Sequence, residues 1–387
     1  MSNNVLIKNK KGYKKTKLGW IPEEWDLLKL GDFFTLTSGI TKPDDLHETQ
    51  ECNDNPVYGG NGVIGYSKQV LLNQKVLIIG RVGEKCGCVH YLQTPCWITD
   101  NALYINSIKK NFNYEYMYYL LQKINLNKYR NKSGQPLISQ KPIYCTIIAM
   151  PKIAEQEKIV EILSAWDDGI ETLEKLIEQK EILKNSLAQK CFRRKNILFP
   201  LKQHKLGELF KNRKETNCCD LELLSVCDGL GIVPRSQLNA KDNSNENKSK
   251  YLKVCIGDLA YNTMRMWQGR CGVSSYEGIV SPAYTVCIPK NNIDVDYMYY
   301  LFKTPHMIHD FWRYSQGIVD DTLNLKFNNF EVIKVWIPDK ETQTKIAKLL
   351  KSYDEELQLL NSKLEKLKEQ KKGLMQKLLT GQIRVKV

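Results

Sequence analysis

The segment PKIAEQEKIVEILSAWD, residues 151–167, returns later in the chain as PDKETQTKIAKLLKSYD, residues 338–354. Identical residues stand at matching places, always 187 positions apart: Pro151 and Pro338, Gln156 and Gln343, Ile159 and Ile346, Leu163 and Leu350, Asp167 and Asp354. Two copies in a constant register predict two equivalent halves with internal pseudo-two-fold character.

The repeat continues outside these two segments with a different spacing. LGDFF at residues 30–34 matches LGELF at 206–210, 176 positions later, and YMYYL at 116–120 recurs at 297–301, 181 positions later. A drifting offset indicates insertions in the loops of a shared scaffold. We therefore predict globular domains over residues 1–150 and 195–337. Each is followed by a long helical segment, over residues 151–194 and 338–387, the second with a C-terminal tail.

Apolar residues after each repeated proline alternate at spacings of four and three, which is the heptad pattern of a coiled coil. The predicted seam contains Ile159, Leu163, Trp166, Ile170 and Leu173 in the first helix, and Ile346, Leu350, Tyr353, Leu357, Leu360 and Leu364 in the second. One departure is Lys180, which stands where the second helix has Leu367.

Each predicted helix has about 38 to 40 residues and a length of roughly 55 to 60 Å. A lone helix of this kind would expose a continuous apolar stripe, so each needs a partner. An interchain coiled coil is the alternative, but the matching length and register favour a pair within one chain. A two-fold axis that exchanges the halves makes these helices antiparallel.

The two segments outside the helices read as β-rich α+β domains. Short β-prone runs at residues 76–79, 102–105 and 284–288 are separated by glycine and asparagine turns. Helical stretches are predicted at residues 114–122 and 295–303. We expect this α+β arrangement and no parallel doubly wound sheet.

The net charge of +14 and the pI near 9.0 point first to nucleic acid, although lysine-rich helix faces also raise the pI. Polar side chains next to glycines are candidates for contacts with bases or phosphates. They are Tyr58, Asn61, Arg81, Lys85, Lys132, Ser133 and Gln135 in the first domain, and Arg235, Arg265, Trp267, Gln268, Arg270 and Gln316 in the second. A solvated turn is the alternative interpretation of each one.

The sequence contains no motif for a catalytic, cofactor or metal site and no signal for a membrane or for secretion. No phosphate-binding loop, dinucleotide-binding turn or amino-methyltransferase tetrapeptide occurs, so we expect no catalytic residues and no cofactor. Cys86, Cys88, His90 and Cys96 lack the paired spacing of a zinc site, and we expect no metal. Without an apolar run of about 18 residues or a signal-peptide core, no membrane is expected, and we place the chain in the cytoplasm.

The whole pattern resembles the specificity subunits of type I restriction-modification systems. The resemblance is carried by LGWIPEEW at residues 18–25, by YGGNGVIGY at 58–66, and by the two helix starts of the form PxxxxQxKI at 151–159 and 338–346. NTMRMWQG at 262–269 and GIVSPAY at 278–284 complete it. The order and duplication of these pieces are more specific than any piece alone.

This resemblance implies two target-recognition domains, each reading half of a bipartite site in double-stranded DNA, with the helix pair as a spacer. It implies as partners two modification (methyltransferase) subunits and the restriction (motor-nuclease) subunits, so that catalysis belongs to other chains. Since the two domains differ in sequence, the half-sites are expected to be non-palindromic. The alternatives are a self-contained methyltransferase or nuclease, and a coiled-coil adaptor that does not bind DNA.

Overall fold

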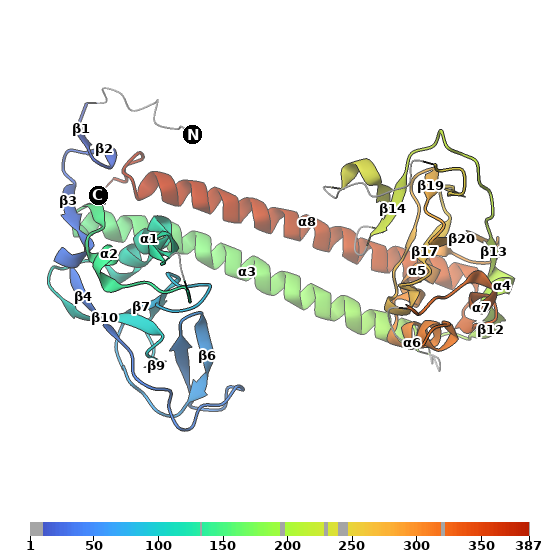
Figure 1. Ribbon diagram of the computed structural model, residues 1–387, viewed down its shortest axis with the longest axis horizontal. Helices are drawn as coiled ribbons and strands as arrows, with labels where there is room; N and C mark the ends of the chain where they lie inside the picture. Colours follow the sequence, from blue (N-terminus) through green and yellow to red (C-terminus); the bar gives the residue numbers. More distant parts are fainter. Residues whose placement is uncertain are drawn as a thin grey trace. The chain divides into compact units, whose positions relative to one another are not determined.

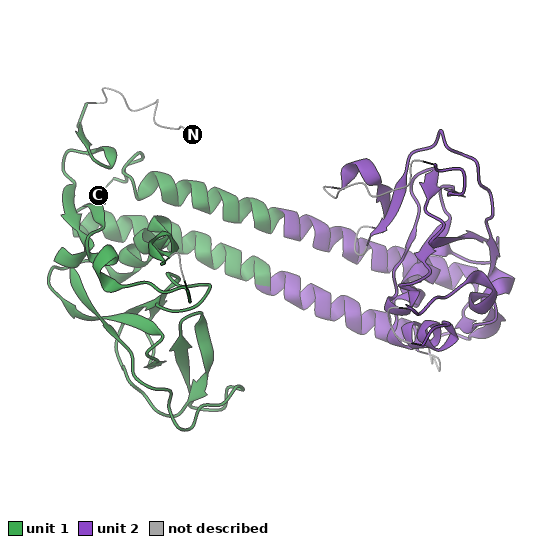
Figure 2. Cartoon of the chain, viewed as in Figure 1, with its two compact units in different colours: residues 1–174, 363–387 green, residues 175–362 purple. Residues whose placement is uncertain are grey.

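The computed structural model describes residues 11–131, 134–193, 198–227, 231–238, 247–318 and 322–386. The chain divides into two compact units, residues 1–174 with 363–387, and residues 175–362 (Figure 2). The boundaries between them fall inside two long helices, α3 (Ile153–Cys191) and α8 (Lys340–Leu378), of 39 residues each (Figure 1). The predicted helix lengths are confirmed, whereas the division into four segments stays a prediction.

The first unit contains a mixture of short strands and helices. Its elements outside the long helices are β1 (Tyr13–Thr16), β2 (Gly19–Pro22), β3 (Asp26–Lys29), η1 (Leu30–Asp32), β4 (Phe34–Ser38), β5 (Asn55–Gly59), β6 (Gly62–Ser67), β7 (Val76–Gly80), β8 (Val89–Leu92), β9 (Trp97–Ile98), β10 (Ala102–Ile108), α1 (Tyr114–Ile124), η2 (Leu126–Tyr129), α2 (Gln140–Tyr144) and β11 (Ile147–Met150).

The second unit has the same kind of content. Its elements are β12 (Lys202–Lys205), α4 (Leu206–Leu209), β13 (Phe210–Asn212), β14 (Leu224–Cys227), β15 (Gly231–Pro234), η3 (Arg235–Gln237), β16 (Leu252–Val254), β17 (Leu259–Asn262), η4 (Met266–Gln268), β18 (Cys271–Val273), β19 (Gly278–Val280), β20 (Tyr284–Pro289), α5 (Val295–Phe302), α6 (Pro305–Tyr314), α7 (Phe327–Phe330) and β21 (Lys334–Ile337).

The sheets show that the sequence repeat is also a structural repeat. The first unit has a four-stranded antiparallel sheet in the order β4-β10-β7-β8, and the second has its counterpart in the order β13-β20-β17-β18. The pair β3 and β11 likewise corresponds to β12 and β21. Strand pairing is antiparallel except between β5 and β9 among the named strands, so the α+β prediction is confirmed.

Each unit has its own hydrophobic core, and the long helices contribute to both. The first core contains Ile159 and Leu163 from α3 with Leu378 from α8, and the second contains Ile346 and Leu350 from α8. Apolar burial of about 25 cal/mol per Å² is the main term that fixes these helices to the domains. The helix ends are therefore parts of the globular units.

The repeated glutamines explain why both helices begin just after a proline. Gln156 donates from Nε2 to the Pro151 carbonyl over 2.9 Å, and its Oε1 accepts the backbone N–H of Asn113 over 2.8 Å. Gln343 makes the matching bonds to the Pro338 carbonyl and to the backbone N–H of Asp294, at 2.8 and 2.9 Å. Both glutamines are 1% exposed, so their amides satisfy backbone groups that would otherwise be buried unpaired.

Asn113 and Asp294 themselves begin helices. The Asn113 side chain accepts backbone N–H groups at the start of α1, and Asp294 accepts one at the start of α5. Such N-caps satisfy backbone donors that a helix leaves unpaired. Each glutamine thereby connects the start of a long helix to the start of the short helix in the same unit, as the sequence repeat requires.

The second link between the long and short helices is a tyrosine, aspartate and lysine cluster. In the first unit the Tyr119 hydroxyl donates to Asp167 over 2.6 Å, and Lys371 forms an ion pair with the same carboxylate. The Lys371 ammonium group also lies 5.1 Å from the centre of the Tyr119 ring. Lys371 belongs to α8, Tyr119 to α1 and Asp167 to α3. Three segments are therefore held by one carboxylate.

The second unit repeats this cluster in every part. Tyr300 donates to Asp354 over 2.6 Å, Lys184 pairs with Asp354, and Lys184 lies 5.9 Å from the Tyr300 ring. Within each unit the ion pairs also give the helix direction: Lys371 with Asp167 and Lys368 with Glu174 in the first, Lys184 with Asp354 and Lys180 with Glu356 in the second. In both units the α3 and α8 segments run antiparallel.

The residues of the predicted seam differ in burial, and the seam stays a prediction. Ile159, Leu163, Leu173, Ile346, Leu350, Leu357 and Leu364 are buried, and Trp166, Ile170, Tyr353 and Leu360 are half-buried. Lys180 occupies its seam position by pairing with Glu356 over 2.7 Å. No helix among the described residues is long and apolar enough to cross a membrane.

The opening motif of the chain packs against the C-terminal segment in the first unit. Trp25 is fully buried and donates from Nε1 to Glu155 over 3.0 Å. Arg384 donates to the same carboxylate from Nε over 2.6 Å and from Nη2 over 3.1 Å. Glu155 is 4% exposed, and these bonds compensate its buried charge.

Candidate nucleic-acid interface

In the first unit, two glycine-containing segments approach closely and bring predicted contact residues together. A Cβ atom on Gly60 would lie 2.0 Å from the Val82 carbonyl oxygen, and one on Gly80 would lie 2.1 Å from that of Gly60. Only glycine permits this backbone contact. It places Asn61 beside Lys85, whose backbone N–H donates to Asn61 Oδ1 over 3.3 Å.

A surface depression of about 270 Å³ lies over this contact. Its lining includes Asn61 and Gln135, both predicted, together with Lys42 and Asn101. Three amides and one ammonium group are suited to base edges and phosphates. Sequence reasoning missed Lys42 and Asn101, because neither stands in a repeated or glycine-rich motif and both reach the depression through tertiary packing.

The other predicted residues of this unit differ in their exposure. Lys85 is exposed, and Arg81 is half-buried and donates from Nη1 to Ser38 Oγ over 3.0 Å. Lys132 and Ser133 lie outside the described residues.

Tyr58 needs a correction, because its side chain is not at the surface. It is 8% exposed, belongs to a small core with Ile78 and Ile98, and its ring lies 5.3 Å from that of His90. Burial also raises the pKa of its hydroxyl. Tyr58 lies within β5 with its side chain in this core, and we remove it from the proposed contacts.

In the second unit, four predicted residues lie in one loop around η4. Arg265 precedes η4, Trp267 lies within it, and Gly269 ends it with a positive φ of 74°. Gln268 and Arg270, on either side of this glycine, are both exposed. A Cβ on Gly269 would lie 3.3 Å from Ile308, which shows that the loop rests on α6.

Trp267 points partly back toward its own loop. Its indole N–H donates to the Met264 carbonyl over 3.0 Å, and the side chain is half-buried. This bond holds the indole ring in place. Only the solvent-exposed part of the ring can stack on a base. Gln268 and Arg270 are the better placed side chains for polar contacts.

Two further predicted residues of this unit come from other segments. Arg235 begins η3, is half-buried, and donates from Nη1 to Ser225 Oγ over 3.4 Å. Gln316 is exposed, and its backbone pairs with that of Asn324 at 3.0 and 2.8 Å. Leu325 N–H then donates to the Thr263 carbonyl over 2.8 Å, which joins the Gln316 segment to the base of the η4 loop.

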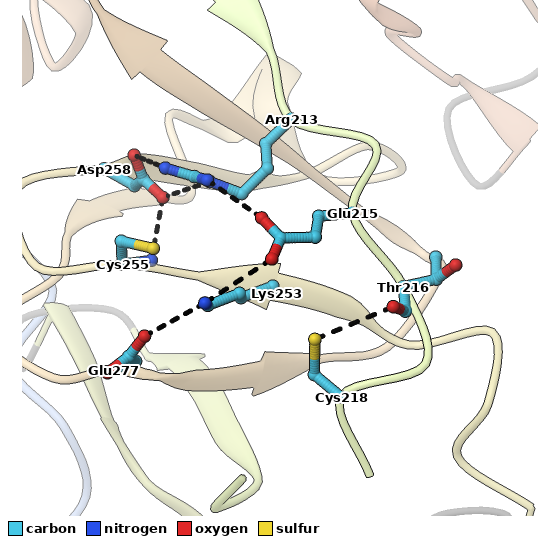
Figure 3. A network of polar contacts seen from close by, with 8 residues as sticks. All are labelled: Arg213, Glu215, Thr216, Cys218, Lys253, Cys255, Asp258 and Glu277. Atoms are coloured by element: carbon cyan, nitrogen blue, oxygen red, sulfur yellow. Dashed lines mark hydrogen bonds and ion pairs between the residues drawn. The ribbon is translucent and has the colours of Figure 1, made fainter.

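A polar network that the sequence did not reveal supports the second domain (Figure 3). Arg213 donates to Asp258 through Nε at 2.7 Å and Nη2 at 3.1 Å, and the Cys255 backbone N–H donates to the same carboxylate. Lys253 lies between Glu215 and Glu277, at 3.4 and 3.2 Å. Asp258 is 2% exposed and raises the pKa of the Arg213 guanidinium.

The family model of the type I restriction modification DNA specificity domain matches residues 22–182 and 231–369. The chain belongs to this family.

Two curated relatives among the specificity subunits show how far the likeness extends. The EcoprrI specificity subunit of Escherichia coli is 29% identical over 162 residues, which are 41% of this chain and 39% of that protein. This match therefore spans about two fifths of the relative's length. The putative MjaX specificity subunit of Methanocaldococcus jannaschii is 24% identical over 421 aligned positions, which cover 97% of both chains.

Solved structures of such subunits share the fold. An S subunit from M. genitalium superposes with a TM-score of 0.66 at 16% identity, covering 98% of this chain and 99% of that one. A chain from a structure of type I restriction-modification complex assembly has a TM-score of 0.55 at 13% identity, with 94% and 99% covered. At these identities the comparison concerns the fold alone.

Two of the cysteines weighed for metal binding lie in different cores of this specificity-domain fold. Cys86 lies in the large core of the first unit, and Cys96 lies in the small core with Tyr58. Both are fully buried, and burial raises the pKa of each thiol. No group of three or more potential metal ligands occurs among the residues that the structure describes.

Proposed function

We propose that the chain is the DNA-recognition subunit of a type I restriction-modification complex and has no catalytic activity of its own. The observation that carries this proposal is a repeated scaffold with unrepeated polar loops. The glutamine and tyrosine–aspartate–lysine contacts recur in both units, whereas the depression around Asn61 and the η4 loop have different residues. Repeated contacts suit two equal partners, and different loops suit two different half-sites.

Each globular domain reads one half of a bipartite, non-palindromic site in double-stranded DNA. The contacts in the first domain come from Asn61, Lys85 and Gln135, with Lys42 and Asn101 added. In the second domain they come from Gln268 and Arg270, supported by Arg265 and Trp267 and flanked by Arg235 and Gln316. Exposed arginine and glutamine can bond base edges bidentately, and lysine neutralises phosphates.

The helices α3 and α8 form one antiparallel coiled coil that acts as the spacer. The supporting facts are their equal lengths, the buried residues at heptad spacing, and antiparallel ion pairs in both units. The repeated clusters at Asp167 and Asp354 give each modification subunit an equivalent surface on which to dock, and the restriction subunits join through the complex. The reducing cytoplasm suits the free thiols of its cysteines.

Sequencing that detects modified adenine tests this function in the source genome. Deletion of the coding sequence should remove methylation at one split motif, while an unchanged methylome in an active system contradicts the proposal. Purified chain that binds S-adenosylmethionine or cuts DNA without partners would support a self-contained enzyme instead. A complete complex that shows no sequence-dependent DNA binding would support a structural adaptor.

The assignment of loops to half-sites has its own test. Arg270→Ala in the assembled methyltransferase should weaken binding about 5- to 150-fold, the range of one lost bidentate base contact. The loss should disappear on DNA whose second-domain half-site is already scrambled. The exposed Arg313 on α6 provides a matched control. Equal loss on DNA scrambled in either half would show that Arg270 does not read one half.

A further inference from the structure

The first unit contains a cavity that no proposed DNA contact uses. It has a volume of about 550 Å³ and lies among α1, η2, β11 and the C-terminal end of α8. Its apolar walls include Leu18, Trp20, Ile21, Leu120, Ile124 and Leu379, and its polar groups include Lys123, Lys128, Gln376, Thr380 and Gln382. Polar and apolar groups share the lining, and a cavity of this size is large enough for a small molecule.

The equivalent place in the second unit has a different lining. A cavity of about 1180 Å³ there includes Thr304 and Gln189, the counterparts of Lys123 and Gln376. Leu301, Val335 and Phe192, which correspond to Leu120, Ile148 and Leu379, surround a space of about 10 Å³. There Trp336 stands at the position of Ala149, and Met307 from α6 fills the position next to it. The lysine in the first cavity is therefore a property of that half, because Thr304 stands at its place in the second.

The charge inside the cavity is unbalanced. Two lysines line it, and no aspartate or glutamate stands among its lining residues in the described part of the chain. Lys123 is half-buried and has no hydrogen bond or ion pair with a described residue. Burial, with a smaller contribution from Lys128, lowers the pKa of Lys123 to about 8. A half-buried ammonium group without a counter-ion is partly desolvated, and an anion that joins it favours its charged form.

We propose that this cavity binds a small molecule with an apolar body and one carboxylate or phosphate group, which pairs with the Lys123 ammonium group. The apolar body lies against Trp20, Ile21 and Leu379, and Lys128 adds a second positive charge at the same side. The proposal is independent of DNA recognition, because none of the loop residues assigned to DNA lines this cavity.

Calorimetric titration of the purified full chain tests the proposal with three probes. Benzoate and phenyl phosphate carry an anionic group on an apolar ring, and benzyl alcohol has the ring without the charge. We expect saturable, millimolar or tighter binding of the two anions and at least ten-fold weaker binding of the alcohol. Affinity should fall as pH rises through about 8, where Lys123 loses its proton; Lys128, Tyr129 and Cys145 are the other titratable groups in the lining.

Two variants identify the site. Lys123→Met should weaken anion binding at least ten-fold, whereas Lys110→Met, at an exposed lysine outside the cavity, should not. Ala149→Trp copies the residue of the second half and should abolish binding by filling the cavity; thermal unfolding of each variant verifies folding. Absence of saturable binding, equal binding of the alcohol, or unchanged binding by Lys123→Met overturns the proposal. If the probes fail and Lys123→Met instead prevents association with the modification subunit, the cavity is a protein-docking site and the proposal is also wrong.

Discussion

Asp354 is the residue at which the structure allows the energetic value of the repeat to be measured. Its carboxylate accepts the Tyr300 hydroxyl over 2.6 Å and forms an ion pair with Lys184. Asp354→Ala removes both interactions and leaves a half-buried tyrosine hydroxyl and a lysine whose side chain is 23% exposed. The α3, α5 and α8 segments of the second unit then lose their common polar contact.

The expected magnitude follows from exposure. A hydrogen bond to a charged group contributes about 1.5–3 kcal/mol when buried, and an exposed ion pair about 0.2–1 kcal/mol. The Asp354 side chain is 43% exposed, so solvent screening favours the lower ends of both ranges. Asp354→Ala should therefore cost about 2 kcal/mol. For a unit of this size that corresponds to a fall in melting temperature of about 4–8 °C.

Urea unfolding and differential scanning calorimetry of the purified full chain measure this loss. Asp167→Ala, in the first unit, should cost a similar amount, because Tyr119 and Lys371 reproduce the same contacts. Glu355→Ala, next to Asp354 on the exposed side of α8, is the matched control and should change little. Tyr300→Phe combined with Asp354→Ala should be less than additive.

The reasoning is refuted if Asp354→Ala costs no more than Glu355→Ala. It is also refuted if the effects of Asp354→Ala and Tyr300→Phe simply add, because residues that share one bond cannot act independently.

Three other predictions concern pH, the second domain and the helix pair. Burial and the adjacent aspartates raise the pKa values of Tyr119 and Tyr300 above the value of about 10 in the unfolded chain. The contribution of these two hydroxyls to the free energy of unfolding is therefore complete below pH about 10 and is lost as the pH rises above it. Urea unfolding at pH 9 and pH 11 measures this loss. Arg213→Met strands the buried Asp258 and should cost about 3–5 kcal/mol, with DNA binding lost mainly at one half-site. Leu364→Asp puts a charge at a buried seam position and should impair binding at both half-sites in gel-shift assays.

The long helices could be predicted from sequence because their signals are local and repeated. The proline and the heptad spacing define α3 and α8, and both helices begin two residues after their proline. The helices α1 and α5 agree with their predicted ranges within a few residues, as amphipathic segments with an asparagine or aspartate cap should. The strands at residues 76–79, 102–105 and 284–288 are confirmed within β7, β10 and β20.

The contact residues were harder to predict, because exposure in a loop depends on tertiary packing. Tyr58 precedes two glycines and resembles a turn residue, but it lies within β5 with its ring in a core. The glycines that follow Tyr58 interrupt the alternation of apolar and polar residues that would have indicated which face of the strand its side chain occupies. The sequence does not indicate whether the Trp267 side chain is exposed or packed. In the structure its indole N–H donates to the Met264 carbonyl, which holds the side chain against its own loop. Lys42 and Asn101 join the depression only through contacts distant in sequence.

The mismatch between Lys180 and Leu367 shows how the two units differ at one repeated position. Lys180 pairs with Glu356 in the second unit, and the corresponding residues in the first unit are Leu367 and Gly169, which line one apolar depression with Trp166. An ion pair and an apolar contact thus replace each other at the same seam position. Either choice is compatible with the predicted heptad spacing, so the repeated helices can carry different side chains at the same position. Two modification subunits that dock on these halves would meet similar backbones but different side chains.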